Sequence, residues 1–503
     1  MDRKKGIGII LGYVLVIAET VVGILFTPIL LHNLGNEEYG LYRLVVSWVS
    51  IISILDFGLG GTITRYVVEY RTNGDRKGES SFLGMAFIVY GVLSVAVLIV
   101  GIVASFFLPE ISGSIKSSQY SEARLAFLIL VLKTSVLLFN HAYTGWYTAY
   151  ERFAFNRILA IGNIILRLCL VALLLPRRPT VYIVVLIDLI LTICQLILNA
   201  VFSKKLLRTI PHLEKWNGSL FKEIMGFTLS LFLASVINQF NSNVDSIVLG
   251  MYSTTISVGL YSCALQIYTM YSSLSTTIQE VYLPAVSTVV FKNSSNKKVT
   301  EALIMPSRMQ IVILLLALEG YILFGKDFLN LWIGHSYNPA EISTCYVTGI
   351  ILMASSTVQL FQNTTTCVLK AKNMLMGRVI ITGISTIFNF VLTLLLVPHY
   401  EIIGAAIGTA ISMIFGYGFA VNIYYRIHVG IDTRLYFKDS LAKLWYAEPL
   451  AFLSGVVIEI LLPTSNCFLF IKVFLFIILY MIIIGAFGLS KQEKNMFITK
   501  IKK

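Results

Sequence analysis

Long apolar runs fill almost the whole of this chain, and they constrain its fold more than any other feature. A helix needs about 20 predominantly apolar residues to cross the hydrocarbon core of a bilayer. Runs long enough to span lie near residues 7–31, 42–64, 82–107, 125–146, 158–175, 181–202, 223–249, 259–283, 306–325, 341–366, 379–397, 404–425, 447–462 and 467–488. We therefore expect an all-α membrane protein with about fourteen transmembrane helices.

The composition leaves little room for a soluble catalytic part. Charged residues make up 13% of the chain and hydrophobic residues 57%, whereas roughly a quarter of a soluble domain is charged. No connection between the runs exceeds about 25 residues, against the 50 or more of an independent domain. The chain has no Walker A lysine loop, no G-x-S-x-G and no H-E-x-x-H. The six cysteines lie singly, without a C-x-x-C pair. We expect neither an enzyme nor a metal or other cofactor site.

The net charge of +13 is distributed unevenly between the two sides of the predicted bundle. If Met1 is cytoplasmic, the inside connections hold most of the lysines and arginines, for example within 65–77, 204–222 and 426–443. The outside connections hold only Arg43, Lys116, Arg124, Arg177, Arg178 and Lys326. Cytoplasmic loops of membrane proteins are enriched in Lys and Arg. This asymmetry predicts cytoplasmic N- and C-termini and an even number of helices, and it accounts for the basic charge without nucleic acid.

Two halves of the chain repeat one another at an offset of about 220 residues. Gly40-Leu41-Tyr42 recurs as Gly259-Leu260-Tyr261, and a helix that ends at Pro176 recurs as one that ends at Pro398. We expect a lobe of six helices in residues 1–222, a second lobe in 223–446, and two further helices with a basic tail in 447–503. Such a repeat is typical of carriers that work by alternating access, although a duplication kept only for packing is the alternative.

Several ionisable residues fall within the predicted spans, where they cost several kcal/mol and are candidates for function. Glu19, Lys133, Arg167 and Asp188 lie deepest. Asp56, Glu280 and Glu319 fall in the outer third of their helices, within reach of headgroups. His141 lies inside the run 125–146 and is a further candidate.

Polar residues also recur at helical spacing within these runs. One face of the fourth helix carries Lys133, Asn140 and Thr144, and Asn163 lies one turn from Arg167. Further stripes contain Asn241 with Asp245, Gln266 with Glu280, and Gln359 with Gln362. Polar stripes do not face lipid, so they meet other helices or water. Hydrogen bonding between helices and a wet central cavity both explain them.

The residue types in such a cavity suggest its cargo. Lys133 and Arg167 would attract phosphate or another anion, and amides and hydroxyls are what sugar hydroxyls require. Glu19, Asp188 and Asp245 would either neutralise these cations or bind Na⁺ or a proton for coupling. The sequence leaves these alternatives open.

Several short segments along the chain form a recognisable set. They are Thr27 to Leu31, Leu34 to Tyr42, Asp56 to Gly60 with Arg65-Tyr66, Asn243 to Asp245, Leu249-Gly250, Val258 to Tyr261, Leu283 to Ser287, Asn389 to Pro398 and Ile403 to Thr409. In their order and spacing they resemble bacterial polysaccharide flippases, and the resemblance covers nearly the whole chain. Such segments are typical of the O-antigen and capsule repeat-unit exporters of the multidrug/oligosaccharidyl-lipid/polysaccharide exporter superfamily. The resemblance implies the two-lobed, fourteen-helix fold of multidrug and toxin extrusion carriers.

The resemblance also implies the activity, the location and the partners. Family members move undecaprenyl-diphosphate-linked oligosaccharides from the cytoplasmic to the outer leaflet of the bacterial cytoplasmic membrane. By position, Arg65, Lys133 and Arg167 would be the cations that contact the diphosphate and sugars. The expected partners are the lipid-linked oligosaccharide, membrane lipids and a polysaccharide polymerase with its chain-length regulator. The peptidoglycan-precursor flippase of this superfamily carries an arginine cluster in its first two helices, where this chain has Glu19 and few arginines.

Two other functions remain open. A cation-coupled multidrug exporter would share the fold but use an acidic, aromatic cavity. An intramembrane polysaccharide polymerase or ligase would need a large periplasmic loop, which the run spacing does not leave room for.

Overall fold

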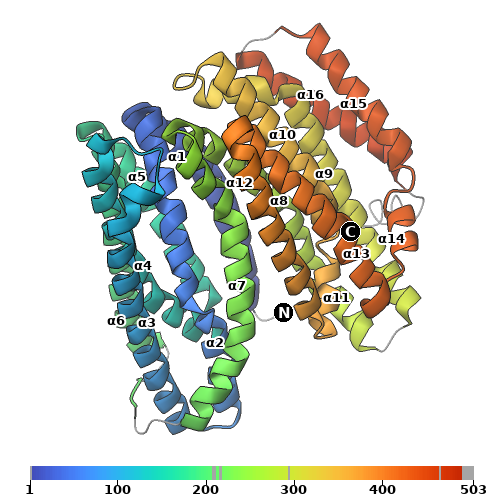
Figure 1. Ribbon diagram of the computed structural model, residues 1–503. Coiled ribbons are helices and arrows are strands. Elements are labelled where there is room, and N and C mark those ends of the chain that lie inside the picture. Colours follow the sequence, from blue (N-terminus) through green and yellow to red (C-terminus); the bar gives the residue numbers. More distant parts are fainter. Residues whose placement is uncertain (1–2, 207–210, 214–217, 293–294, 464–465, 490–503) are drawn as a thin grey trace. The chain divides into compact units, whose positions relative to one another are not determined.

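The computed structural model describes residues 3–206, 211–213, 218–292, 295–463 and 466–489. Within these ranges the chain is helical and contains no strand. Its α-helices are α1 (Arg3–Ile52), α2 (Leu59–Thr72), α3 (Arg76–Ile111), α4 (Tyr120–Ala149), α5 (Phe153–Leu174), α6 (Val181–Leu206), α7 (Gly218–Tyr252), α8 (Thr255–Phe291), α9 (Asn296–Ile333), α10 (Pro339–Phe361), α11 (Thr365–Ala371), α12 (Leu375–Met413), α13 (Val421–Tyr424), α14 (Thr433–Ser440), α15 (Leu444–Leu461) and α16 (Asn466–Ile483) (Figure 1). Short 3₁₀ and π segments join some of them, among them η1 (Ser53–Asp56).

The helices form two compact units, Met1–Ser262 and Cys263–Lys503. The order of helices repeats: α9, α10 and α12 begin about 220 residues after α3, α4 and α5. The boundary between the two compact units falls inside α8, and α7 packs against α1 within the first unit. The predicted division at 222 and 446 describes the repeat and stays a prediction.

Nine segments of the described chain are long and apolar enough to cross a membrane. They are Val14–Thr72, Arg76–Glu110, Ser117–Ala149, Phe153–Arg177, Val181–Ser203, Pro339–Phe361, Leu375–Val429, Thr433–Leu461 and Phe468–Gly488. The first of these segments contains most of α1 together with η1 and α2, so one apolar segment can contain more than one helix. The expected all-α membrane architecture is confirmed, while the count of about fourteen stays a prediction.

Two of the predicted connections are sharp breaks inside longer helices. α1 breaks at Gly35, where φ is 78°, and α12 breaks at Glu401, where φ is 46°. Both breaks lie between neighbouring predicted runs, and Gly35 adopts the left-handed backbone without a side-chain clash.

The predicted run 42–64, in contrast, is not one helix. After η1, Phe57 and Gly58 both take left-handed conformations, with φ of 54° and 66°, and α2 begins only at Leu59. Two successive residues with positive φ end a right-handed helix, so the expectation of a continuous span here is wrong.

In the first unit, α4 packs against α2, α3 and α6 and carries much of the core. A Cβ on Gly145 would lie 2.4 Å from the Gly60 carbonyl oxygen, so the two glycines allow α4 and α2 to approach closely. The Thr64 hydroxyl donates to the Gly145 carbonyl at 2.9 Å across this contact. α4 is thereby held between several helices, which fixes the direction of its polar side chains.

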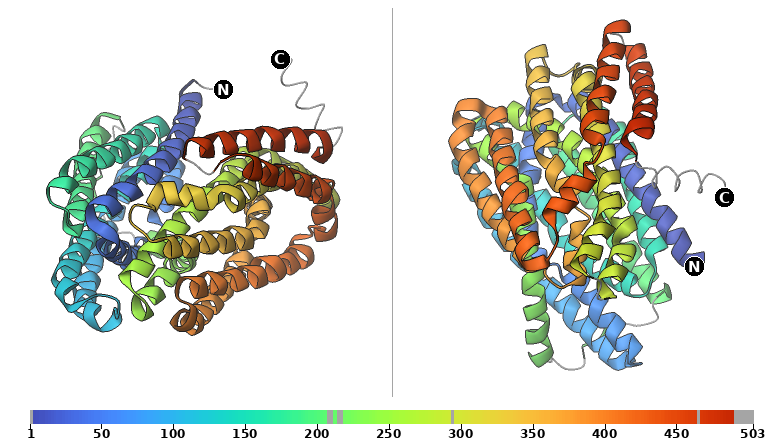
Figure 2. Two further views of the ribbon diagram at one scale, coloured as in Figure 1. Left: turned by 90° about the horizontal axis from the view of Figure 1, so that it is seen from above. Right: turned by 90° about the vertical axis from the view of Figure 1, so that its right-hand side faces the viewer.

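In the second unit, α15 and α16 run side by side against α9 (Figure 2). Lys472 on α16 is 1% exposed and donates to Glu459 Oε2 on α15 at 2.9 Å. The buried Arg308 guanidinium on α9 donates to four backbone carbonyls, those of Asp439, Ser440, Ala442 and Gly488. These contacts tie the last helices of the chain to α9.

Candidate functional site

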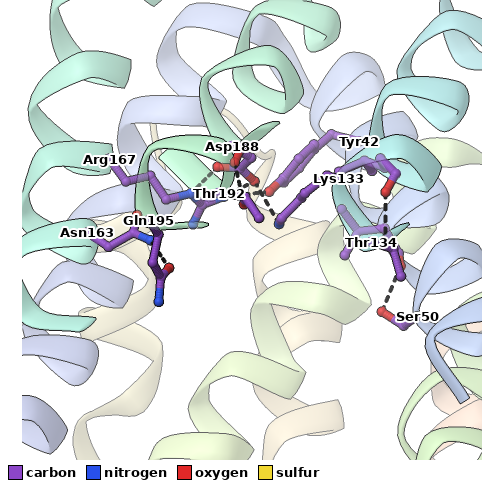
Figure 3. Close-up of polar contacts among 11 residues, drawn as sticks. Tyr42, Ser50, Lys133, Thr134, Asn163, Arg167, Asp188, Thr192 and Gln195 are labelled. Atoms are coloured by element: carbon purple, nitrogen blue, oxygen red, sulfur yellow. Dashed lines mark hydrogen bonds and ion pairs between the residues drawn. The ribbon is translucent and has the colours of Figure 1, made fainter. Parts of the chain in front are cut away.

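A cavity of about 530 Å³ lies in the first unit among α1, α4, α5 and α6. Its polar lining comes from all four helices (Figure 3). The polar lining residues are Tyr42, Arg43, Ser50, Ser53, Lys133, Thr134, Asn163, Arg167, Asp188, Thr192 and Gln195. The cavity therefore brings Lys133, Arg167 and Asp188, which the sequence singled out on three different helices, to one place.

Asp188 holds two cations at once. Arg167 Nε donates to Asp188 Oδ1 at 2.5 Å, and Arg167 Nη2 donates to Oδ2 at 3.0 Å. Lys133 Nζ lies 3.4 Å from the same Oδ2 (Figure 3). The Asp188 carboxylate is 5% exposed, whereas each cation is 29% exposed. The carboxylate thus lies in the wall, and the two cations extend from it toward the cavity.

Neighbouring aromatic groups fix the position of Arg167. Its Nη2 also donates to the Tyr42 hydroxyl at 2.9 Å, and its guanidinium carbon lies 4.2 Å from the centre of the Phe26 ring. Both aromatic residues belong to α1, so Arg167 connects α5 to α1 as well as to α6. A guanidinium that stacks on a ring and forms a two-pronged contact has few other orientations.

Arg43 is a third cation in the cavity, and the prediction that it lies in an outside connection is wrong. α1 resumes directly after Gly35, so Arg43 lies within that helix. In the described part of the chain its guanidinium has no hydrogen bond or ion pair, and it lines the cavity. The cavity therefore holds three cations against one carboxylate.

Hydroxyls and amides complete the lining. The hydroxyls of Ser50, Ser53 and Thr134 donate to backbone carbonyls three or four residues earlier at 2.6 to 2.9 Å, and the Ser53 oxygen also accepts from Gln239. The hydroxyl oxygens of Ser50 and Thr134 remain able to accept hydrogen bonds. Asn163 Nδ2 donates to Gln195 Oε1 at 2.8 Å. The remaining amide groups of this pair can bind polar groups of a guest.

Asn140 and Arg65 do not line this cavity. Asn140 is 1% exposed, donates to the Thr192 carbonyl at 3.1 Å and accepts from Asn199 Nδ2 at 2.9 Å, so it joins α4 to α6. Arg65 is exposed on α2, with its guanidinium 5.6 Å from the centre of the Tyr66 ring. Of the two stated explanations for polar stripes, hydrogen bonding between helices fits Asn140.

The remaining predicted site residues also lie outside the cavity lining. Glu19 is exposed on α1, and Asn241 is partly exposed on α7. Asp245 is buried and accepts from the Tyr261 hydroxyl at 2.7 Å. Gln266 and Gln359 belong to the second unit. Within the described ranges, no three His, Cys, Asp or Glu side chains cluster as metal ligands.

Residues 4–290 match the family model described as polysaccharide biosynthesis protein. The chain belongs to this family. Among relatives of this family member, "Probable flippase AglR" of Haloferax volcanii is 32% identical over 184 residues, which cover 36% of the chain and 37% of AglR. "Probable low-salt glycan biosynthesis flippase Agl15" of the same organism is 23% identical and covers 79% of the chain and 77% of Agl15. The chain thus matches about a third of AglR's length and most of Agl15.

Solved structures establish the fold of this family member. The lipid II flippase MurJ in an inward closed conformation superposes with a TM-score of 0.75 at 15% identity, over 95% of this chain and 98% of MurJ. An inward-facing multidrug resistance MATE transporter of the MOP superfamily gives a TM-score of 0.65 at 16% identity, over 82% and 94% of the two chains. The MATE-like fold is therefore confirmed. The relatives named above are described as flippases, and the solved structures as a flippase and a transporter, in agreement with the prediction that the chain is not an enzyme.

Proposed function

We propose that this protein is a flippase that moves undecaprenyl-diphosphate-linked oligosaccharide units from the cytoplasmic to the outer leaflet by alternating access. The observation that carries the proposal is the cavity in which Arg43, Lys133 and Arg167 face a single carboxylate, Asp188. Cations inside a membrane bundle are costly unless they are used. An anionic guest that enters the cavity supplies the missing negative charge.

The donor geometry suits a diphosphate. Arg43 offers its five N–H donors without competition from an acid among the described residues. Arg167 uses Nε and Nη2 for Asp188 and Tyr42, which leaves Nη1 for a guest. Guanidinium groups bind phosphate oxygens in pairs, and lysine adds a point charge. The three cations together provide more donors than one carboxylate can use.

The neutral lining suits the sugars. Ser50, Ser53 and Thr134 present hydroxyl oxygens, and Asn163 with Gln195 presents amides. Sugar hydroxyls both donate and accept hydrogen bonds, so they match groups of both kinds. A cavity of about 530 Å³ lies within the range of small-molecule sites and has room for a diphosphate with the first sugar.

Asp188 has a role in the empty state. It keeps Lys133 and Arg167 extended and partly neutralised while no guest is present. A diphosphate that enters competes with Asp188 for both cations and binds Arg43 without competition. Release of the guest restores the ion pairs of Asp188 with Lys133 and Arg167. The empty carrier then returns to its starting conformation with two of its three cations paired.

The charge asymmetry of the sequence supports a topology with both termini in the cytoplasm, in a bacterial cytoplasmic membrane. A polysaccharide polymerase and its chain-length regulator would then receive the product at the outer face.

The proposal is tested by the leaflet exposure of the lipid-linked glycan in cells depleted of the protein. Complementation with wild type should restore exposure, and complementation with Lys133→Ala or Arg167→Ala should not. Lys326→Ala, an exposed lysine of the second unit, is the control and should behave as wild type. Exposure that never falls on depletion, in a strain without a second flippase, would contradict the proposal.

A further inference from the structure

A second polar cluster lies beside the break between η1 and α2. His141 Nδ1 on α4 lies 3.1 Å from Asp56 Oδ2 at the end of η1. The side chain of Asp56 is 24% exposed and that of His141 is 42% exposed. Both residues belong to segments that can cross the membrane, so the pair lies within the bundle and still has an open side.

A buried tyrosine completes the cluster. The Tyr90 hydroxyl on α3 is 0% exposed and faces the Asp56 carboxylate closely enough to interact with it directly. Asp56 is therefore contacted from two helices, through His141 on α4 and through Tyr90 on α3.

The break is a feature of the first repeat alone. Alignment of Gly40-Leu41-Tyr42 with Gly259-Leu260-Tyr261 puts Asp56 opposite Ser275. There α8 runs without interruption from Thr255 to Phe291, and the Ser275 hydroxyl donates to the Leu360 carbonyl at 2.5 Å. The fold therefore does not require a break at this position. Phe57 even takes a left-handed conformation, which is rare for a bulky residue.

The cluster is connected to the cavity by one turn on each side. Ser53 and Leu137 line the cavity. Asp56 follows Ser53 by three residues of 3₁₀-helix, and His141 follows Leu137 by four residues of α4. One turn contains about three residues in a 3₁₀-helix and 3.6 in an α-helix, so both side chains lie one turn beyond the lining.

We propose that Asp56 and His141 form a proton-binding site at this break, and that its occupation couples the proposed flippase to the proton gradient. The coupling to transport rests on the proposed function, whereas the proton-binding site does not. With Nδ1–H donating to Asp56, Nε2 of His141 is free to take up a proton on the more exposed side of the pair. The occupied pair is neutral overall, and the empty pair carries one negative charge.

A change of charge at this point acts on a break that three helices contact. The break is connected to α4 through His141, to α3 through Tyr90 and to α7 through Phe57, whose ring stacks on Phe232 at 4.3 Å. Among the described side chains, His141 and Tyr90 are the titratable groups that face Asp56. The contact from α7 is made by Phe232 and by Gln239, which donates to Ser53, and neither is ionisable. Interrupted membrane helices are where carriers bind coupling ions.

The site is tested first by proton binding itself. Protein with ¹⁵N-labelled histidines is titrated by NMR in nanodiscs, and the resonance absent from His141→Gln is assigned to His141. We expect this resonance to respond to proton binding as the pH is varied, and Asp56→Asn to alter the response, because the carboxylate that faces the imidazole is gone. A resonance that does not respond to pH, or that responds alike in wild type and Asp56→Asn, overturns the site.

The coupling is tested in sodium-free proteoliposomes that contain lipid-linked glycan extracted from depleted cells. We expect an imposed pH difference to change the wild-type flipping rate, and His141→Gln to lose this response while it still flips without a gradient. His32→Gln, an exposed histidine on α1, is the matched control and should respond as wild type. Wild-type flipping that ignores the gradient overturns the coupling and leaves the flippase intact. A wild type that does not flip at all contradicts the proposed function, and the coupling with it.

Discussion

Arg167 contacts Asp188 through two nitrogens, with Nε 2.5 Å from Oδ1 and Nη2 3.0 Å from Oδ2. The pair joins α5 to α6 in the wall of a cavity that contains two more cations, Lys133 and Arg43. The pair joins two helices, whereas the excess of positive charge carries the proposed function. The two roles predict different phenotypes for neighbouring residues.

Asp188→Asn should lower the stability of the protein. Removal of one partner of a buried ion pair costs about 3–5 kcal/mol, because the other charge is left without compensation. The cations here are partly exposed, so we expect a loss at the lower end of that range, seen as a fall in melting temperature in detergent. Arg167→Gln combined with Asp188→Asn should recover part of the loss. Equal melting temperatures for wild type and Asp188→Asn would show that the pair is not structural.

Arg43→Gln should separate binding from stability. Since the described chain offers its guanidinium no partner, the melting temperature should stay near that of wild type. A hydrogen bond to a charged group contributes about 1.5–3 kcal/mol, so transport should fall about 10- to 100-fold. Arg178→Gln, an exposed arginine before α6, is the control for the loss of one positive charge. Normal glycan exposure with Arg43→Gln would remove this residue from the site.

Asn140→Ala should have the opposite phenotype. Its amide connects α4 to α6 through Thr192 and Asn199, so its loss should cost about 1–3 kcal/mol of stability. Transport per folded molecule should stay as in wild type. Thr144→Ala, four residues along the same helix and exposed, should change neither quantity. Lost transport at an unchanged melting temperature would mean that Asn140 binds the cargo.

Arg308→Lys should destabilise the second unit although the charge is kept. The guanidinium donates to four carbonyls at 2.7 to 3.2 Å, and an ammonium cannot reach all of them from one point. We expect a lower melting temperature and less folded protein in the membrane. Arg434→Lys, an exposed arginine on α14, serves as the control. A melting temperature like that of wild type would show that these carbonyl contacts contribute little.

Much of the fold and part of the site could be predicted because the bilayer imposes strong rules on sequence. Apolar run length predicted membrane helices, and the recurrence at about 220 residues predicted the order of α3 to α5 and α9 to α12. Lys133, Arg167 and Asp188 stood out since charges inside apolar runs are rare. Pairing of Asp188 with these cations was one of two alternatives that the sequence left open, because spacing within a helix says nothing about how α4, α5 and α6 are rotated against each other.

Two errors have local causes. Arg43 lies at the edge of an apolar run, where a connection was expected, whereas α1 restarts after Gly35 and includes Arg43. The run 42–64 was expected to be continuous because its hydropathy is high throughout. Hydropathy does not report φ, and only Gly58 signals the break between η1 and α2.

The central claim is that this cavity carries a lipid-linked diphosphate across the membrane, and reconstituted flipping tests it most directly. Purified protein in proteoliposomes is given lipid-linked glycan, and the fraction accessible to an impermeant glycosidase is followed over time. The account predicts that wild type moves the glycan, that Arg43→Gln with an unchanged melting temperature moves it at least about 10-fold more slowly, and that Arg178→Gln matches wild type. Glycan that stays in its leaflet, in vesicles where the same protein exports a cationic drug, would contradict the account and favour a multidrug exporter.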